Sequence, residues 1–148
     1  MLVSFYNNLV AKYPVSKVTG WIDQLSLLAL RLWIADIFFK SGRNKIADWE
    51  TTLYLFAEVH PVPLLPVNVA AFLATASELI FPVLVAIGIF SRLTVVPLLF
   101  MTIIIEAFIL PNPQHYYWIL MMAIIVARGS GSLSADHFLQ KKFGFNKI

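Results

Sequence analysis

The chain has 148 residues, a formal net charge of +3 and no cysteine. Hydrophobic residues make up 59% and charged residues 13% of it, against about 45–50% and about 25% in soluble domains. A single domain of this length leaves much of its surface exposed and cannot bury so much apolar surface in its own core. The composition therefore predicts an integral membrane protein. The missing cysteines exclude disulfides, thiol redox chemistry and thiolate metal or iron–sulfur sites in this chain. The sequence lacks a basic run with interleaved aromatic residues, the pattern that would indicate nucleic-acid binding.

Residues 1–24 precede the first apolar segment and predict an interfacial amphipathic segment. Its apolar residues recur at helical spacing: Leu2, Phe5, Tyr6, Leu9 and Val10. Pro14 and Gly20 then interrupt the pattern. Residues 1–20 contain no long uncharged apolar stretch followed by a small-residue cleavage site, so we expect no secretory signal peptide. The first spanning helix is expected to act as an uncleaved insertion signal.

Four apolar segments follow, at residues 25–42, 67–90, 93–110 and 116–127. A membrane-spanning helix needs about 20 residues, so the first and fourth segments are short. Tyr116 and Tyr117 support the fourth, because aromatic residues are typical of the membrane interface. The pattern predicts an all-α fold, an integral membrane four-helix bundle formed by residues 25–128.

The connections predict two further short helices. In the first loop, residues 43–66, Trp49, Leu53 and Phe56 recur at helical spacing, which predicts an amphipathic surface helix. Pro61, Pro63 and Pro66 follow it. Gly129 and Gly131 suit the end of the fourth span. Residues 129–148 then form a basic amphipathic tail, with Ser134 as the expected N-cap of its helix.

The distribution of basic residues predicts the orientation in the membrane. Cytoplasmic loops carry an excess of Lys and Arg. Seven basic residues belong to the termini and the second turn: Lys12, Lys17, Arg92, Arg128, Lys141, Lys142 and Lys147. The other side carries three, Lys40, Arg43 and Lys45. Both termini are therefore expected in the cytoplasm.

Four charged residues inside the apolar segments predict a polar intramembrane pocket: Arg31, Asp36, Glu78 and Glu106. A charge at the bilayer centre costs about 2.5–3.5 kcal/mol, so each needs a partner or a watery cavity. Asp36 and Lys40 are four residues apart on one helix, which favours a local ion pair. Arg31 and Asp36 do not share a helix face, so we hypothesise an Arg31–Glu78 pair between helices. That pair is either a structural contact or one wall of the pocket. An unpaired Glu78 could instead carry a proton, which leaves a proton-handling role open.

The candidate ligand-binding residues are Trp33, Lys45, His60 and His115, of which His60 and His115 are expected at the outer interface. Glu106 could meet Lys45, His60 or His115, or it could be solvated at the interface. We predict no metal site, although His60, His115 and Glu106 would supply a two-histidine, one-carboxylate set. The aromatic residues, Trp33 among them, could line a pocket for a flat ring such as a quinone, or they could simply lie at the interface.

Residues 30–139 resemble the DoxX family of small bacterial membrane proteins. The resemblance is carried, in chain order, by Arg31…Gly42-x-x-Lys45, Trp49-Glu50-Thr51-Thr52-Leu53, Val62-Pro63-Leu64-Leu65-Pro66, Glu78-Leu79, Arg92, and Arg128-Gly129-Ser130-Gly131-Ser132-Leu133-Ser134-Ala135-Asp136. Asp36 and Ser130 depart from the family pattern, which favours a small or apolar residue and a proline there. The resemblance implies a multi-pass protein of the bacterial inner membrane that is linked to redox or quinone-associated complexes.

Three functions are compatible with these observations. The first is a small subunit of a membrane redox system, with quinone as the candidate cofactor and redox proteins as partners. The second is a non-catalytic assembly or scaffold protein, since no complete active site is recognisable and its status as an enzyme is open. The third is a small transporter, suggested by the intramembrane carboxylates but weakened by the lack of an inverted repeat unless the chain forms a homo-oligomer.

Overall fold

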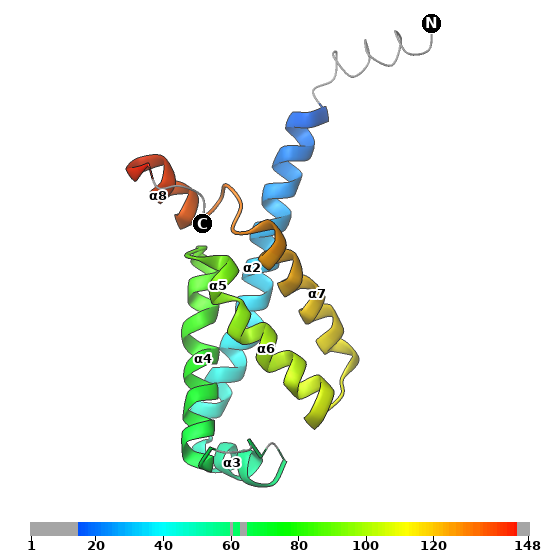
Figure 1. The fold of residues 1–148 in the computed structure, drawn as a ribbon, viewed down its shortest axis with the longest axis vertical. Helices are drawn as coiled ribbons and strands as arrows, with labels where there is room; N and C mark the ends of the chain where they lie inside the picture. Colours follow the sequence, from blue (N-terminus) through cyan, green and yellow to red (C-terminus); the bar gives the residue numbers. More distant parts are fainter. Residues whose placement is uncertain (1–14, 60, 63–64, 145–148) are drawn as a thin grey trace, which may run out of the picture.

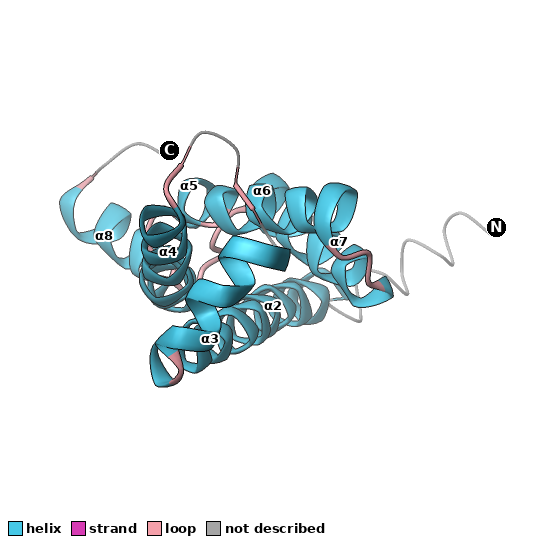
Figure 2. Cartoon of the chain, turned by 90° about the horizontal axis from the view of Figure 1, so that it is seen from below, coloured by secondary structure: helices cyan, strands magenta, loops and turns pink. Residues whose placement is uncertain are grey.

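The computed structural model describes residues 15–59, 61–62 and 65–144 of the chain. Every regular element within these ranges is a helix, which confirms the all-α prediction (Figures 1 and 2). Most of the amphipathic segment predicted at residues 1–24 lies outside the described residues. The chain forms long helices that pack side by side, with short helices at the two opposite ends (Figure 1).

The first described helix, α2 (Val15–Ala47), has 33 residues and is longer than the predicted segment at both ends. The interruption expected at Gly20 is wrong, because α2 runs straight through it. One glycine inside a helix costs only about 1 kcal/mol relative to alanine, which a long helix tolerates. At the other end the extension places Lys45 on the same helix as Arg31.

The helix α4 (Val67–Ile87) makes the most extensive contact with α2 and runs antiparallel to it (Figure 1). It ends at Gly88, whose φ of +81° is a left-handed conformation that favours glycine. The backbone N–H groups of Gly88 and Ile89 both donate to the carbonyl oxygen of Leu84, at 2.9 and 3.0 Å. This bonding closes α4 and turns the chain into the next helices.

The third predicted span is helical but not uniform. It comprises α5 (Ser91–Thr94), α6 (Val96–Ile104) and a π-helical turn, η2 (Ile105–Ile109). The N–H of Leu110 donates to the carbonyl of Ile105 at 2.9 Å, the five-residue step of a π turn. The fourth predicted span is α7 (Pro113–Arg128), which packs on α6 and α2.

The two predicted short helices are both present. In the first loop, α3 (Trp49–Tyr54) continues into a π-helical turn, η1 (Leu55–Val59). Asp48 caps α3 and accepts from the N–H of Thr51 at 3.0 Å. Hydrogen bonds from the Thr51 side chain and backbone lower the pKa of Asp48. The prediction that prolines follow this helix includes Pro63, which lies outside the described residues.

The C-terminal helix α8 (Ala135–Phe143) follows Gly129 and Gly131, as predicted. The Ser134 hydroxyl accepts from the N–H of His137 at 3.2 Å, which confirms Ser134 as the N-cap. Figure 1 places α8 at the opposite end of the molecule from α3.

The apolar core lies where the long helices meet near the middle of the molecule. Its buried residues are Ile34, Phe38, Val85, Val95, Leu98, Met122 and Ile125. Two helical stretches in the described part of the chain are long and apolar enough to cross a membrane, Val67–Ile87 and Ser91–Ile109, each with a mean hydropathy of 2.0.

Candidate functional site

A cavity of about 830 Å³ lies at the α3 end of the molecule and is lined by residues of α2, α3, η1, α4, α6, η2 and α7. Most of its lining is apolar, with Phe38, Phe56, Phe100 and Trp118 among the walls. Its polar lining residues are Lys40, Ser41, Asn44, Lys45, Asp48, Thr51, Thr52, Glu78, Thr102 and His115. A cavity of this size with apolar walls and placed polar groups is typical of small-molecule sites.

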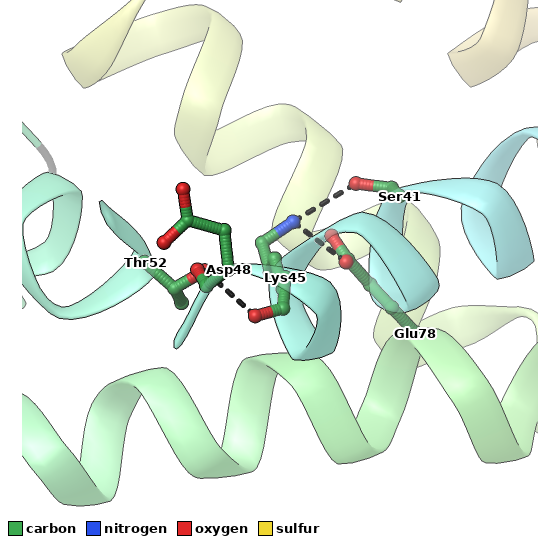
Figure 3. Close-up of polar contacts among 5 residues, drawn as sticks. All are labelled: Ser41, Lys45, Asp48, Thr52 and Glu78. Atoms are coloured by element: carbon green, nitrogen blue, oxygen red, sulfur yellow. Dashed lines mark hydrogen bonds and ion pairs between the residues drawn. The ribbon is translucent and has the colours of Figure 1, made fainter. Parts of the chain in front are cut away.

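An ion pair between α2 and α4 forms one polar wall of this cavity (Figure 3). Lys45 Nζ lies 2.7 Å from Glu78 Oε2 and donates to Ser41 Oγ at 2.9 Å. Ser41 and Lys45 are one helical turn apart on α2, so both side chains face α4. The side chain of Glu78 is only 5% exposed and that of Lys45 is 22% exposed. The pair is therefore a largely desolvated charge pair that lines the cavity.

Close contact between the two helices brings Glu78 up to α2. At Gly42, an added Cβ would lie 3.0 Å from the Leu79 side chain and 3.1 Å from Glu78 Cβ. The absence of a side chain at Gly42 thus permits the approach. The α2–α3 corner then fixes Lys45, because the Thr52 hydroxyl lies 3.0 Å from the Lys45 carbonyl oxygen and 2.9 Å from that of Asp48 (Figure 3).

A second polar pair, Glu106 of η2 and His115 of α7, borders the same cavity through His115, which is a lining residue. Glu106 Oε2 lies 2.9 Å from His115 Nδ1 and accepts from the N–H of Asn112 at 2.8 Å. Both side chains are nearly buried, at 9% and 11% exposure. With Nδ1 held by the carboxylate, the imidazole has Nε2 left for other contacts. The His115 ring also packs 5.1 Å from the Trp118 ring, and both residues line the cavity.

Of the three partners considered for Glu106, the structure selects His115. Lys45 pairs with Glu78 instead, and His60 lies outside the described residues. The two-histidine, one-carboxylate set therefore cannot be assembled from the described residues. Within the ranges that the structure describes, no group of three His, Asp or Glu side chains is placed to hold a metal ion.

The hypothesised Arg31–Glu78 pair is wrong. In the antiparallel register, Glu78 lies opposite Gly42, eleven residues along α2 from Arg31, which is about 16 Å at the helical rise. Arg31 is fully buried at the other end of the molecule and donates to the carbonyl oxygens of Leu133 and Ala86. Since Ala86 belongs to the last turn of α4, the guanidinium also faces the negative end of that helix dipole.

Asp36 and Trp33 also lie away from the cavity. Asp36 forms the expected pair with Lys40 at 2.7 Å, which confirms the local ion pair, but the two side chains are 59% and 68% exposed. Trp33 is 63% exposed and does not line the cavity. The predicted set of four intramembrane charges is thus divided: Glu78 lines the cavity, Glu106 holds a lining histidine, and Arg31 and Asp36 do neither.

Sequence reasoning missed Ser41, Thr52 and Asn44 as lining residues. The signal for Ser41 was present, because it precedes Lys45 by four residues. Thr52 could be found only by knowing how the chain turns between α2 and α3, which residue spacing does not determine.

The chain is similar to known proteins over most of its length. A family model described as DoxX matches residues 26–112. An uncharacterized protein of Haemophilus influenzae is 30% identical, and the alignment covers 86% of this chain and 91% of that protein. No solved structure matches the chain significantly.

Proposed function

The chain belongs to the DoxX family, and from this premise we propose that it is a small subunit of a bacterial inner-membrane redox system that binds a quinone. In this proposal the quinone ring occupies the cavity at the α3 end. The lipid bilayer and membrane redox proteins are its partners.

The exposed surface of the long helices supports a four-span arrangement. Each of the four carries large apolar side chains on its outer face, for example Trp33, Phe72, Ile103 and Leu120. In the two most apolar stretches only 33% and 28% of the residues are buried, whereas a core helix of a soluble protein would be mostly buried. Contact with lipid would explain why these helices expose so much apolar surface. With the positive-inside rule, both termini and α8 then lie in the cytoplasm.

The observation that carries the quinone proposal is one cavity in which apolar walls are combined with the polar side chains of Lys45 and His115. A quinone has a flat apolar ring and two carbonyl oxygens that accept hydrogen bonds. An ammonium group has three donors, and Ser41 and Glu78 use two of those on Lys45. The third donor is left for a ligand oxygen, and Nε2 of His115 is a second polar contact.

Two π-helical turns border the same cavity, which also favours a binding role. Leu55 and Phe56 of η1 and Ile105 and Ile109 of η2 are lining residues. π turns inside helices are rare and are frequent at functional sites. An assembly protein without a ligand would need neither the cavity nor these turns.

The thermal unfolding midpoint of the purified protein should rise in the presence of a short-chain ubiquinone analogue, because a ligand that binds only the folded state stabilises it. Lys45→Met should weaken the apparent affinity at least about tenfold, since a hydrogen bond from a charged donor contributes about 1.5–3 kcal/mol. Each variant is compared with its own midpoint without ligand.

The control is Arg43→Gln, which removes an exposed cation from the same helix without touching the cavity. It should keep the full response. An equal response of wild-type protein to a ringless alkyl alcohol of similar length would contradict the proposal. Co-purification from native membranes in mild detergent tests the proposed redox partners and any self-association.

A further inference from the structure

A second cleft, of about 660 Å³, lies at the opposite end of the molecule, between α5, the loop at residues 129–134 and α8. It is separate from the proposed quinone cavity, which lies at the α3 end (Figure 1). Its lining includes Ser91, Arg92, Arg128 and Ser130, together with the apolar residues Phe90 and Leu93.

The walls of this cleft are fixed by hydrogen bonds between distant parts of the chain. The Asp136 carboxylate accepts from the N–H of Phe90 at 3.0 Å and from the Ser130 hydroxyl at 2.7 Å. The N–H of Asp136 donates to the carbonyl of Gly88 at 3.1 Å. Arg31 donates to the carbonyl of Leu133 just before α8. The start of α8 is therefore docked on the helix assembly, and the cleft is a preformed feature.

The charges in the cleft leave one arginine available. Arg128 pairs with Asp23, with both carboxylate oxygens at 2.6 Å. Asp136 is occupied by the contacts that hold α8. Among the described residues, the only hydrogen bond that Arg92 makes is a long one, 3.5 Å, to the carbonyl of Ala127. Arginine presents a planar set of donors that matches the oxygens of a phosphate.

A buried polar group supports the same site. Ser91 is 1% exposed, and within the described part of the chain its hydroxyl has no hydrogen-bond partner. Buried hydroxyls are normally satisfied, and Ser91 and Arg92 line the same cleft, so this unpaired hydroxyl is a second donor for an acceptor bound there. Gly129 keeps the space open, because an added Cβ there would lie 3.0 Å from Arg92 Nε.

Apolar side chains border the cleft and continue along α8. Leu93 is 63% exposed and Phe90 48% exposed. On α8, Phe138 and Phe143 are exposed beside Lys141 and Lys142, and Lys142 Nζ lies 6.0 and 5.5 Å from their ring centroids. A basic helix with exposed aromatic residues suits the surface of an anionic membrane. The cleft therefore combines a site for a phosphate with surfaces for acyl chains.

We infer that this cleft binds the headgroup of an anionic phospholipid of the cytoplasmic leaflet, with the phosphate at Arg92 and Ser91 and the acyl chains along Leu93 and Phe90. The inference rests on the membrane arrangement proposed above. The inference also assigns a location to α8. The helix lies on the same leaflet as the bound lipid, where Lys141 and Lys142 add to the electrostatic attraction for anionic lipids.

The test measures the thermal unfolding midpoint of the full chain in a neutral detergent, titrated separately with phosphatidylglycerol, phosphatidylcholine and inorganic phosphate. Phosphatidylglycerol should raise the midpoint, and the other two should have little effect. Arg92→Gln should weaken the apparent affinity for phosphatidylglycerol about fivefold, the effect of one basic residue near an anionic surface. Arg43→Gln, at the opposite end, should leave it unchanged.

Ser91→Ala provides a second variant whose folding is safe, because it removes only an unpaired hydroxyl. It should leave the midpoint without lipid unchanged and weaken the response to phosphatidylglycerol. An equal response to phosphatidylcholine, an equal response to inorganic phosphate, or an unchanged affinity in both variants would overturn the inference. Arg92→Gln should retain the full quinone response. The two proposals are therefore tested separately: the lipid site can be refuted while the quinone proposal stands, and the quinone proposal can be refuted while the lipid site stands.

Discussion

Gly88→Ala is expected to lower the free energy of unfolding by about 2–5 kcal/mol, the combined cost of a left-handed alanine and an overpacked interior. The added Cβ would lie 2.0 Å from Arg31 Nη1 and 2.6 Å from Ser134 Cβ. Both neighbours are held: the Arg31 side chain is fully buried, and Ser134 caps α8. Neither can move without breaking the contacts that dock α8. Unfolding by sodium dodecyl sulfate in mixed micelles, followed by circular dichroism, measures the loss.

Gly144→Ala is the matched control. Gly144 has a similar φ of +68° at the end of α8, but an added Cβ there would meet nothing within 4 Å. It should show only the backbone cost of about 1 kcal/mol. Equal losses for the two variants would mean that the crowding around Arg31 adds nothing to the cost.

Lys45→Met should lower the free energy of unfolding by about 3 kcal/mol, because breaking a buried ion pair leaves one charge without its partner. Here the group left behind is the Glu78 carboxylate, whose side chain is 5% exposed. The double variant Lys45→Met/Glu78→Leu should recover most of the loss, since replacing both charges by apolar side chains removes the desolvation cost as well. The same denaturation experiment on all four proteins gives the coupling energy between the two sites.

Additive effects in this double-variant cycle would refute the pairing. In that case the Lys45→Met/Glu78→Leu protein would be less stable than either single variant. Lys40→Met is the control: its ion pair with Asp36 is exposed to more than half on each side chain, so it should cost less than about 1 kcal/mol.

Local spacing in the sequence predicted the features that depend on neighbouring residues. The apolar segments became helices, the Asp36–Lys40 pair formed across one helical turn, and Ser134 caps α8. Each of these depends on residues within a few positions of one another. The geometry of a helix is then enough to place them.

Contacts between helices could not be predicted in the same way, because they depend on register. Arg31 and Glu78 were plausible partners because both are charged residues inside apolar segments and Arg31 does not share a helix face with Asp36. In the structure the register is set by the close approach at Gly42, which places Glu78 beside Lys45. Lys45 can pair with Glu78 only because α2 continues beyond residue 42. The charged residues after position 42 did not indicate that the helix continues.

The partners of Arg31 show a second reason why contacts between helices could not be predicted from the sequence. The charge of Arg31 suggested a partner side chain of opposite charge, but its guanidinium donates to backbone carbonyls at the end of α4 and before α8. Backbone acceptors occur at every residue, and only the fold determines which are left unpaired at a helix end. No residue pattern could have identified Ala86 and Leu133.

The π turn η2 makes the Glu106–His115 contact depend on the length of the chain as well as on its residue types. A π turn contains one residue more than an α turn, so η2 behaves as a single-residue insertion in a helix. Removing one residue of η2 after Glu106 would rotate the rest of this helical turn by about 100° and shift it by about 1.5 Å. His115 would then leave the cavity although every side chain of the site was still encoded. Comparisons within the family should therefore count residues across this hairpin before matching its histidines.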